Sequence, residues 1–250
     1  MSDYLTGKVI LINKPLHWTS FNVVYKVKCI IKKYLSSTYI VSDPTQPRVG
    51  KMEKFKLKVG HAGTLDPLAT GLLIVCVGKE TKNIDSYQAQ EKEYTGTFVL
   101  GATTPSYDME KEVDKYYDTI HITKEMIQAA AQKFTGTFEQ TPPIFSAIRV
   151  NGRRAYKIAR SGKTAEIAAK TITISEFEIT RIAMPQIDFR IVCSKGTYIR
   201  ALARDFGETL ESGAYLSALC RTRIGQFKLE DALTIDGLDE VVSKETKPEE

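Results

Sequence analysis

The sequence predicts an α+β protein with a mixed, mainly antiparallel sheet flanked by helices. Segments that alternate apolar and polar residues recur along the chain, as strands with one buried face do. Stretches with helical periodicity separate them, and no repeat or low-complexity linker divides the 250 residues. We expect one domain over residues 1–228, with an insertion loop at 36–58, followed by an acidic tail at 229–250 that forms no separate domain.

The N-terminal region is predicted to form a strand, a helix and a loop. Residues 9–12 are a short apolar run that ends before Pro15, as a buried strand does. Ser20 can cap a helix over residues 21–34, whose apolar side chains recur on one face. The polar stretch 36–58 contains two prolines and a glycine, so we expect a long loop or a partly ordered insertion.

Strands and helices continue to alternate in the rest of the chain. The predicted strands are residues 73–77, 94–101, 170–179 and 187–193. The predicted helices are residues 123–134, which Thr123 begins, and 198–211, which Thr197 caps. Residues 103–117 are polar and acidic, and are predicted to be a loop.

Charge is distributed unevenly along the chain. Up to Lys228 there are 33 Lys and Arg against 22 Asp and Glu, whereas from Leu229 onward there are 2 against 8. A basic body with an acidic end suggests a polyanionic partner, although a well-solvated surface explains charge alone equally well.

Several protein classes are excluded by composition and motifs. No apolar run approaches the ~18–20 residues of a membrane span, and residues 1–8 lack a signal-peptide pattern. The four cysteines are scattered without a metal-ligand spacing, so a metal site and a disulfide scaffold are improbable, and a reducing cytoplasm is the simplest location. The glycines around Gly78 and Gly60 match neither a P-loop nor a dinucleotide fingerprint.

The most informative segment runs from Gly60 to Gly71 and reads GHAGTLDPLATG. It places a histidine and a lone carboxylate, Asp66, between backbone-permissive glycines. A structural alternative exists, because Asp66 before Pro67 is also typical of a helix N-cap followed by proline at the first helical position.

This segment resembles the signature G-H-x-G-x-L-D-P-x-A-x-G-x-L of the TruB-type tRNA pseudouridine synthases. The resemblance covers residues 8–227 in separated blocks, which include Asn13-Lys14-Pro15, Ser194-Lys195-Gly196-Thr197-Tyr198-Ile199-Arg200 and Leu219-Cys220-Arg221. It implies the pseudouridine synthase fold, and it implies that Asp66 is the catalytic residue.

Arg200 lies in the first turn of its predicted helix, where a cation is disfavoured by ~0.3–1 kcal/mol relative to the other end. A carboxylate partner would compensate, and the resemblance makes that partner Asp66, which the pair would keep ionised. Pairing with a nearby Glu is the alternative. Arg204 is expected to pair with Glu208 on the helix surface.

The remaining candidate residues take their roles from the resemblance. It implies that Tyr94 stacks on the target base, where an ordinary sheet tyrosine is the alternative. Lys14 either contacts an RNA phosphate or is a surface lysine, and His61 either contacts a nucleotide or is a turn histidine. Substrate contacts are also expected from Arg160, Tyr198 and Leu219.

The family converts uridine to pseudouridine at position 55 in the T arm of tRNA, without cofactor, metal or energy source. We therefore expect an enzyme that flips the target base and binds tRNA as a monomer without the family's C-terminal RNA-binding domain. A non-catalytic RNA-binding or RNA-folding protein and a guide-RNA-dependent relative are the rival hypotheses. Whether Asp66 attacks the ribose or the base stays open.

Overall fold

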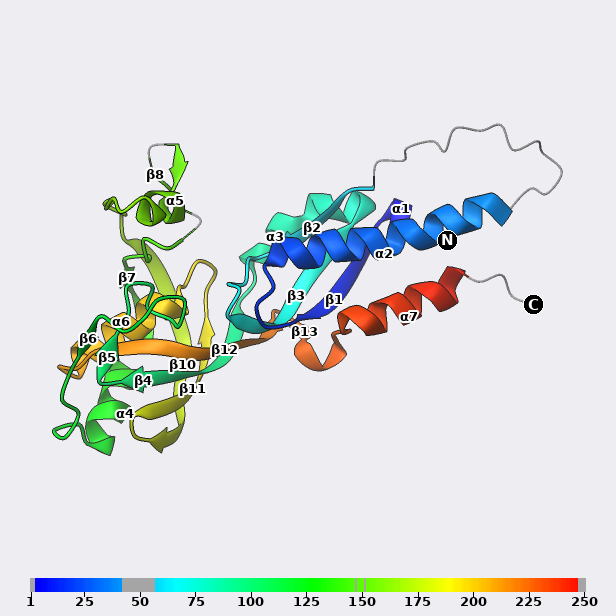
Figure 1. Ribbon diagram of the computed structural model, residues 1–250. Helices are drawn as coiled ribbons and strands as arrows, with labels where there is room; N and C mark the ends of the chain where they lie inside the picture. Colours follow the sequence, from blue (N-terminus) through cyan, green and yellow to red (C-terminus); the bar gives the residue numbers. More distant parts are fainter. Residues whose placement is uncertain (1–2, 42–56, 147, 151, 247–250) are drawn as a thin grey trace. The chain divides into compact units, whose positions relative to one another are not determined.

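The computed structural model describes residues 3–41, 57–146, 148–150 and 152–246. These residues form two compact units: unit 1 combines residues 1–90 with 221–250, and unit 2 comprises residues 91–220 (Figure 1). The α+β class is confirmed. The boundary at residue 228 is not seen, because unit 1 is built from both ends of the chain.

Unit 1 is organised around strand β3 (Ala69–Val77), which lies between two antiparallel neighbours. Both β1 (Lys8–Lys14) and β2 (Val59–Ala62) pair with it, since Lys8 and Val59 are both opposite Val77. Alternate residues of β3 enter two hydrophobic clusters: Leu73 and Val75 in one, and residues 72, 74 and 76 in the other. Both faces of β3 are therefore covered, which explains its continuous apolar run.

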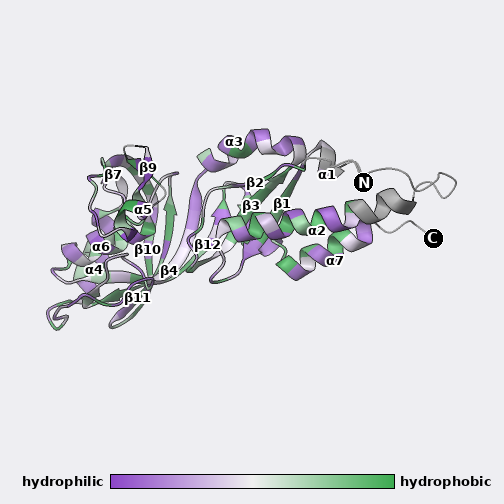
Figure 2. Ribbon diagram, turned by 45° about the horizontal axis from the view of Figure 1, so that its top comes forward, coloured by the Kyte–Doolittle hydropathy of each residue, from purple (hydrophilic) through white to green (hydrophobic). Residues whose placement is uncertain are grey.

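Helix α2 (Ser20–Val41) covers one face of unit 1 and is longer than predicted. It continues through residues 36–41 of the predicted loop, because each added residue gains a hydrogen bond and no proline occurs between Ser20 and Pro44. The rest of the predicted loop, residues 42–56, lies outside the described residues. Hydrophobic and hydrophilic colours alternate along α2 in Figure 2, as expected for an amphipathic helix.

Thr19, not Ser20, caps α2. The Thr19 hydroxyl accepts a hydrogen bond from the Asn22 backbone N–H at 3.0 Å, and the Asn22 side-chain oxygen accepts one from the Thr19 N–H at 2.9 Å. This reciprocal pair is a capping box with Asn in the position that Glu usually takes. Ser20 is thereby released for another contact.

The acidic C-terminal segment is part of unit 1, and its described residues are not a loose tail. After β13 (Phe227–Lys228) and the 3-10 turn η2 (Leu229–Asp231), helix α7 (Ile235–Thr246) packs beside α2. Leu238 and Val242 are buried in the same hydrophobic cluster as β3. The sequence did not predict this helix, because its apolar stripe is narrow and its other face is acidic.

The short elements of unit 1 complete its edges. Helix α1 (Asp3–Thr6) precedes β1, and Tyr4 on it donates a 2.6 Å hydrogen bond to Glu245 on α7. After β3 the chain forms η1 (Gly78–Asn83) and α3 (Ile84–Ala89), and Ile84 and Tyr87 pack on the second cluster of β3.

Unit 2 contains an antiparallel sheet of four strands in the order β4, β11, β10, β7, with β12 beside β4. The strands are β4 (Lys92–Leu100), β11 (Gln186–Cys193), β10 (Lys170–Ala183), β7 (Gly136–Gln140) and β12 (Ala214–Ile224), of which β12 enters unit 1 at Arg221. The predicted alternation is confirmed, since Tyr94, Phe98 and Leu100 are buried.

The core of unit 2 is aromatic. Helix α6 (Ile199–Thr209) places Phe206 with its ring centroid 5.4 Å from Phe98 and 5.7 Å from Phe177. The predicted cap of this helix is wrong: the Thr197 hydroxyl donates to the Ser194 carbonyl at 3.0 Å, and Tyr198 holds the cap position. The Thr197 hydroxyl closes the turn before the helix, so it does not cap the helix.

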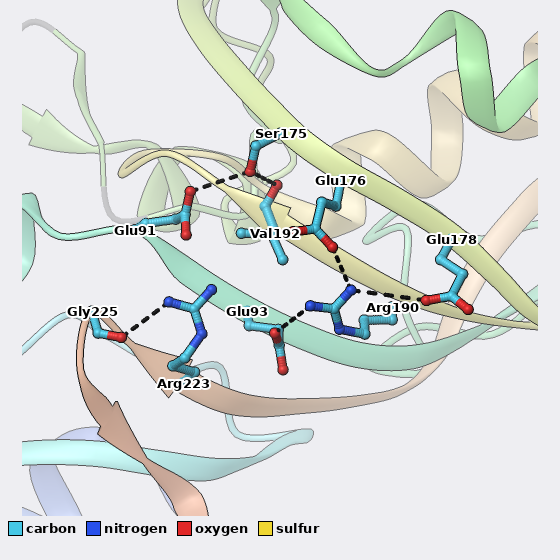
Figure 3. A network of polar contacts seen from close by, with 9 residues as sticks. All are labelled: Glu91, Glu93, Ser175, Glu176, Glu178, Arg190, Val192, Arg223 and Gly225. Carbon is cyan, nitrogen blue, oxygen red and sulfur yellow. Dashed lines mark hydrogen bonds and ion pairs between the residues drawn. The ribbon is translucent and has the colours of Figure 1, made fainter.

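Charged side chains connect three strands of this sheet (Figure 3). Arg190 on β11 donates to Glu93 on β4 at 2.8 Å and to Glu176 on β10 at 2.5 Å, and Glu178 lies 3.8 Å away. Ser175 donates to the Val192 carbonyl at 3.2 Å. Cross-strand contacts of this kind contribute roughly 0.2–1 kcal/mol each.

The remaining elements of unit 2 are short. They are β5 (Ala102–Thr103), β6 (Lys115–Tyr116), α4 (Lys124–Lys133), β8 (Arg149–Val150), β9 (Arg153–Arg154) and α5 (Ala155–Arg160). Thr123 caps α4 by accepting from the Met126 N–H at 3.3 Å, which confirms that predicted start. The predicted loop 103–117 contains β6, which pairs with β5.

No helix among the described residues is long and apolar enough to cross a membrane. The same part of the chain contains no group of three or more His, Cys, Asp or Glu side chains that could hold a metal ion.

Candidate functional site

Asp66 lies on the loop between β2 and β3; a glycine with positive φ begins this loop, and a second lies near the start of β3. Gly63 has φ 94° and Gly71 has φ 101°, a region that residues with a Cβ rarely adopt. The Asp66 carbonyl accepts a hydrogen bond from the Ala69 N–H at 3.1 Å, and Pro67 occupies the second position of this tight turn. Strand β3 follows at once, so the helix N-cap alternative is wrong.

Ser20 holds the residue before Asp66. Its hydroxyl accepts from the Leu65 N–H at 2.9 Å and donates to the Leu65 carbonyl at 3.2 Å. Both side chains are buried, with exposed fractions of 2% for Ser20 and 3% for Leu65. One hydroxyl therefore satisfies both backbone groups of Leu65, and the backbone that carries Asp66 is tied to the start of α2.

Lys14 holds the residue after Asp66. Its ammonium donates to the carbonyls of Trp18 at 2.6 Å, Pro15 at 2.9 Å and Pro67 at 3.4 Å, and its side chain is fully buried. The surface-lysine alternative is therefore wrong, and the contact with an RNA phosphate stays a prediction. Sequence periodicity could not show that three carbonyls converge on this ammonium.

The pKa of Lys14 is lowered from 10.5 to about 8, chiefly by burial; the charge of Asp66 opposes this shift and the charge of Arg221 adds to it. At neutral pH Lys14 is thus a cation whose field reaches Asp66.

Arg221 is the residue that sequence reasoning missed. It is 1% exposed, and its guanidinium donates to the Leu72 carbonyl at 2.8 Å and to the Gly63 carbonyl at 3.1 Å. One side chain therefore joins both ends of the Asp66 loop. It occurs in a quoted block of the resemblance, but strand alternation alone does not predict a buried arginine there.

His61 lies on β2, close enough to Arg221 to be affected by its charge. Burial lowers the pKa of His61, and the arginine lowers it further, so the imidazole is neutral at neutral pH. Its buried Nδ1 has no hydrogen-bond partner among the residues that the structure describes. Unit 1 therefore brings together Asp66, Lys14, His61 and Arg221.

Arg200, in unit 2, is buried and has the acidic partner that its position requires. Its Nε lies 3.6 Å from Asp108, and its two terminal nitrogens donate to the Ser106 carbonyl at 3.2 Å and the Phe145 carbonyl at 2.9 Å. Asp108 is 5% exposed and offsets a cation at a helix start. Asp66 belongs to unit 1, so its ion pair with Arg200 stays a prediction.

Tyr94, Tyr198 and Leu219 lie at distinct places in unit 2. Tyr94 is on β4 and 9% exposed, and Leu219 is on β12 and half-buried. Tyr198 precedes α6, where its backbone N–H donates to the Gln140 side-chain oxygen at 2.9 Å. Their contacts with substrate stay predictions.

Arg204 and Arg160 each pair with a carboxylate of unit 2, and the partner of Arg204 is not the predicted one. Arg204 pairs with Asp205, at 2.6 Å, and not with Glu208, because its side chain turns toward the adjacent carboxylate. Arg160 on α5 pairs with Glu110 at 2.9 Å, and both groups are exposed. An exposed pair of this kind is worth about 0–1 kcal/mol, so it leaves Arg160 available to an anion.

The sequence of this chain is similar to those of known proteins over most of its length. The family model described as TruB family pseudouridylate synthase (N terminal domain) matches residues 51–199. The chain is 51% identical over 238 residues to tRNA pseudouridine synthase B of Flavobacterium johnsoniae, covering 95% of this chain and 97% of the relative. It is 50% identical to the protein of the same name from Phocaeicola vulgatus, covering 95% and 94%.

Solved structures agree. The chain superposes on a protein of a Cbf5-Nop10-Gar1 complex with a TM-score of 0.67 and 26% identity, covering 95% of this chain and 54% of that longer chain. A chain from an H/ACA RNP bound to a substrate RNA containing 2'-deoxyuridine gives a TM-score of 0.64 at 25% identity, covering 97% and 56%. The predicted fold is confirmed.

Proposed function

The chain belongs to the TruB family of pseudouridylate synthases, and we propose that within this family it modifies uridine 55 in the T arm of tRNA. Uridine-to-pseudouridine isomerisation in tRNA follows from the family and from relatives about half identical over nearly the whole chain. The position in tRNA, the flipped base and the aspartate mechanism are the proposed refinements.

The proposed mechanism rests on one observation, namely that three side chains fix the loop that carries Asp66. Ser20, Lys14 and Arg221 fix the backbone at residues 63, 65, 67 and 72, so the Asp66 carboxylate is presented from a rigid turn. Two buried cations, Lys14 and Arg221, belong to this arrangement, and Lys14 is close enough to Asp66 for the two charges to interact. A preorganised, charged nucleophile or stabiliser is what cleavage of a glycosidic bond requires.

The reaction itself is balanced without an added reagent. The bond between N1 of the base and C1′ of the ribose breaks, the base turns, and a bond from C5 to C1′ forms. The proton on C5 is lost and N1 gains one, so no net oxidation or reduction occurs. We assign Asp66 to the covalent or electrostatic step at the ribose or the base, Arg200 to its orientation, and Tyr94 to the base and the final proton transfer.

RNA binding is supported by the exposed basic residues around α5. Arg149, Arg153, Arg154 and Lys157 are exposed within a short segment. Such residues bind phosphates and make affinity depend on salt. Extraction of the target base from its stack costs a few kcal/mol, which these contacts and stacking on Tyr94 would offset.

The test uses the purified chain and an unmodified tRNA transcript, with pseudouridine mapped by chemical derivatisation. We expect one site in the T arm in the wild type and none with Asp66→Asn, while tRNA binding is retained. Asp85→Asn, on the exposed face of α3, is the matched control and should be fully active.

Four outcomes would contradict the proposal. Modification at another position would overturn the T-arm assignment, and an active Asp66→Asn would overturn the mechanism. Activity that appears only with an added guide RNA would favour the guide-dependent alternative, and binding without any isomerisation would favour an RNA-folding role.

A further inference from the structure

Unit 1 exposes its large hydrophobic side chains in one place. Among its described residues these are Leu16, 47% exposed, Phe21, 71%, and Tyr25, 62%. A single exposed apolar residue is ordinary, but three within ten residues form a patch. Helical periodicity puts Phe21 and Tyr25 on neighbouring turns of α2.

Lysines continue this stripe along α2. Lys28 and Lys32 follow Tyr25 at helical spacing, so Phe21, Tyr25, Lys28 and Lys32 share one side of the helix, which we term the aromatic–lysine face. The sequence of α2 contains no acidic residue. Of its four lysines, only Lys33 has an ion-pair partner among the described residues, Asp239 at 3.8 Å.

This face adjoins the loop that carries Asp66. His17, next to Leu16, donates its backbone N–H to the Pro67 carbonyl at 2.8 Å, and Ser20, next to Phe21, binds Leu65. Two exposed apolar residues therefore adjoin contacts of the candidate catalytic loop, Leu16 beside His17 and Phe21 beside Ser20.

We propose that the aromatic–lysine face binds a stretch of the substrate RNA outside the target nucleotide. Unpaired bases stack on Phe21 and Tyr25, and Lys28 and Lys32 contact the phosphates that follow. The inference rests on the proposed function for its ligand and extends it to a second contact surface. Exposed aromatic rings interleaved with cations suit single-stranded or looped RNA, because every base has a face to stack and every nucleotide a charge.

A protein partner fits less well. The core of a protein interface is typically depleted in charged residues, and Lys is depleted across interfaces. Here two lysines lie in line with the rings, and α2 carries positive charge alone. This charge pattern matches a phosphate backbone.

The test compares two double variants, Phe21→Ala with Tyr25→Ala, and Lys28→Ala with Lys32→Ala. Matched controls are Tyr116→Ala, which removes a ring that is 78% exposed in unit 2, and Lys82→Ala, on the exposed part of η1. All four substitutions at the face are at exposed or half-exposed positions, so thermal unfolding should stay close to wild type. Affinity for the unmodified tRNA transcript and for its isolated T-arm stem-loop is measured by fluorescence anisotropy across salt concentrations.

We expect the aromatic double variant to weaken binding of the transcript by about 5- to 150-fold, as loss of one stacked base predicts. The lysine double variant should lower the slope of log affinity against log salt by about 1.4, as loss of two phosphate contacts to a single strand predicts. The kcat at saturating tRNA should be unchanged in both variants.

Unchanged affinity and salt slope, in variants that still modify tRNA, would overturn the aromatic–lysine face and leave the proposed function intact. A loss of tRNA affinity no greater than that of the controls Tyr116→Ala and Lys82→Ala would also overturn the aromatic–lysine face. A wild-type chain that neither binds nor modifies tRNA would overturn both proposals, and this is visible before any variant is made.

Discussion

Ser20→Ala isolates the contribution of backbone positioning to catalysis. The substitution removes only the hydroxyl oxygen that bonds both backbone groups of Leu65, at 2.9 Å and 3.2 Å, in a buried environment. Leaving a buried polar group unsatisfied costs ~1–3 kcal/mol. For a chain of this size each kcal/mol lowers the melting temperature by roughly 2–4 °C, so a decrease of about 2–12 °C is expected.

The larger effect is expected on the rate. Asp66 follows Leu65 directly, and a small displacement of a reacting group can cost about 100-fold. We expect kcat to fall about 10- to 100-fold while KM changes little, because no substrate-binding side chain is removed. Single-turnover kinetics on an unmodified tRNA transcript measures this, and calorimetry or circular dichroism measures the melting temperature.

Thr19→Ala is the matched control. It removes the neighbouring hydroxyl, which caps α2 and does not contact Leu65, and cap loss costs ~0.5–2 kcal/mol. It should lower stability without lowering kcat, and Ser20→Thr, which keeps a hydroxyl, should recover part of the rate. The reasoning is refuted if Ser20→Ala turns over at the wild-type rate, or if Thr19→Ala loses as much kcat.

Three further predictions concern buried charge and packing. The folded chain releases the Lys14 proton near pH 8 and the unfolded chain near 10.5, so the unfolded state binds more protons between these values. The unfolding free energy of the wild type should therefore rise with pH across this window relative to Lys14→Met in denaturant titrations, and a difference independent of pH would contradict the shifted pKa. Asp108→Asn leaves the buried Arg200 without that carboxylate and should cost ~3–5 kcal/mol of unfolding free energy, whereas a loss below ~1 kcal/mol would mean that the carbonyl partners suffice. Leu238→Ala should cost ~2–5 kcal/mol, measured the same way, because Leu238 is 1% exposed; a negligible loss would show that α7 is dispensable to unit 1.

The sequence alone predicted the elements whose pattern is local. The predicted strands at residues 94–101 and 187–193 and the predicted helix at residues 198–211 are confirmed, because burial of one face imposes a period that is visible in the sequence. The Asp66 loop was also located from sequence, because its glycines and proline restrict the backbone residue by residue. These features depend only on residues that are neighbours in the sequence, so the sequence alone predicts them.

The contacts that hold the site were decided by the tertiary structure. Ser20, Lys14 and Arg221 reach the Asp66 loop from α2, β1 and β12, so their partners are backbone carbonyls and N–H groups distant in sequence. No composition or spacing indicates which carbonyl a buried cation will meet. The same holds for Arg204, which pairs with its neighbour Asp205, and for α7, which is acidic on one face and buried on the other. The packing of the folded chain determines these partners, because a buried polar group must form hydrogen bonds with the groups that lie beside it.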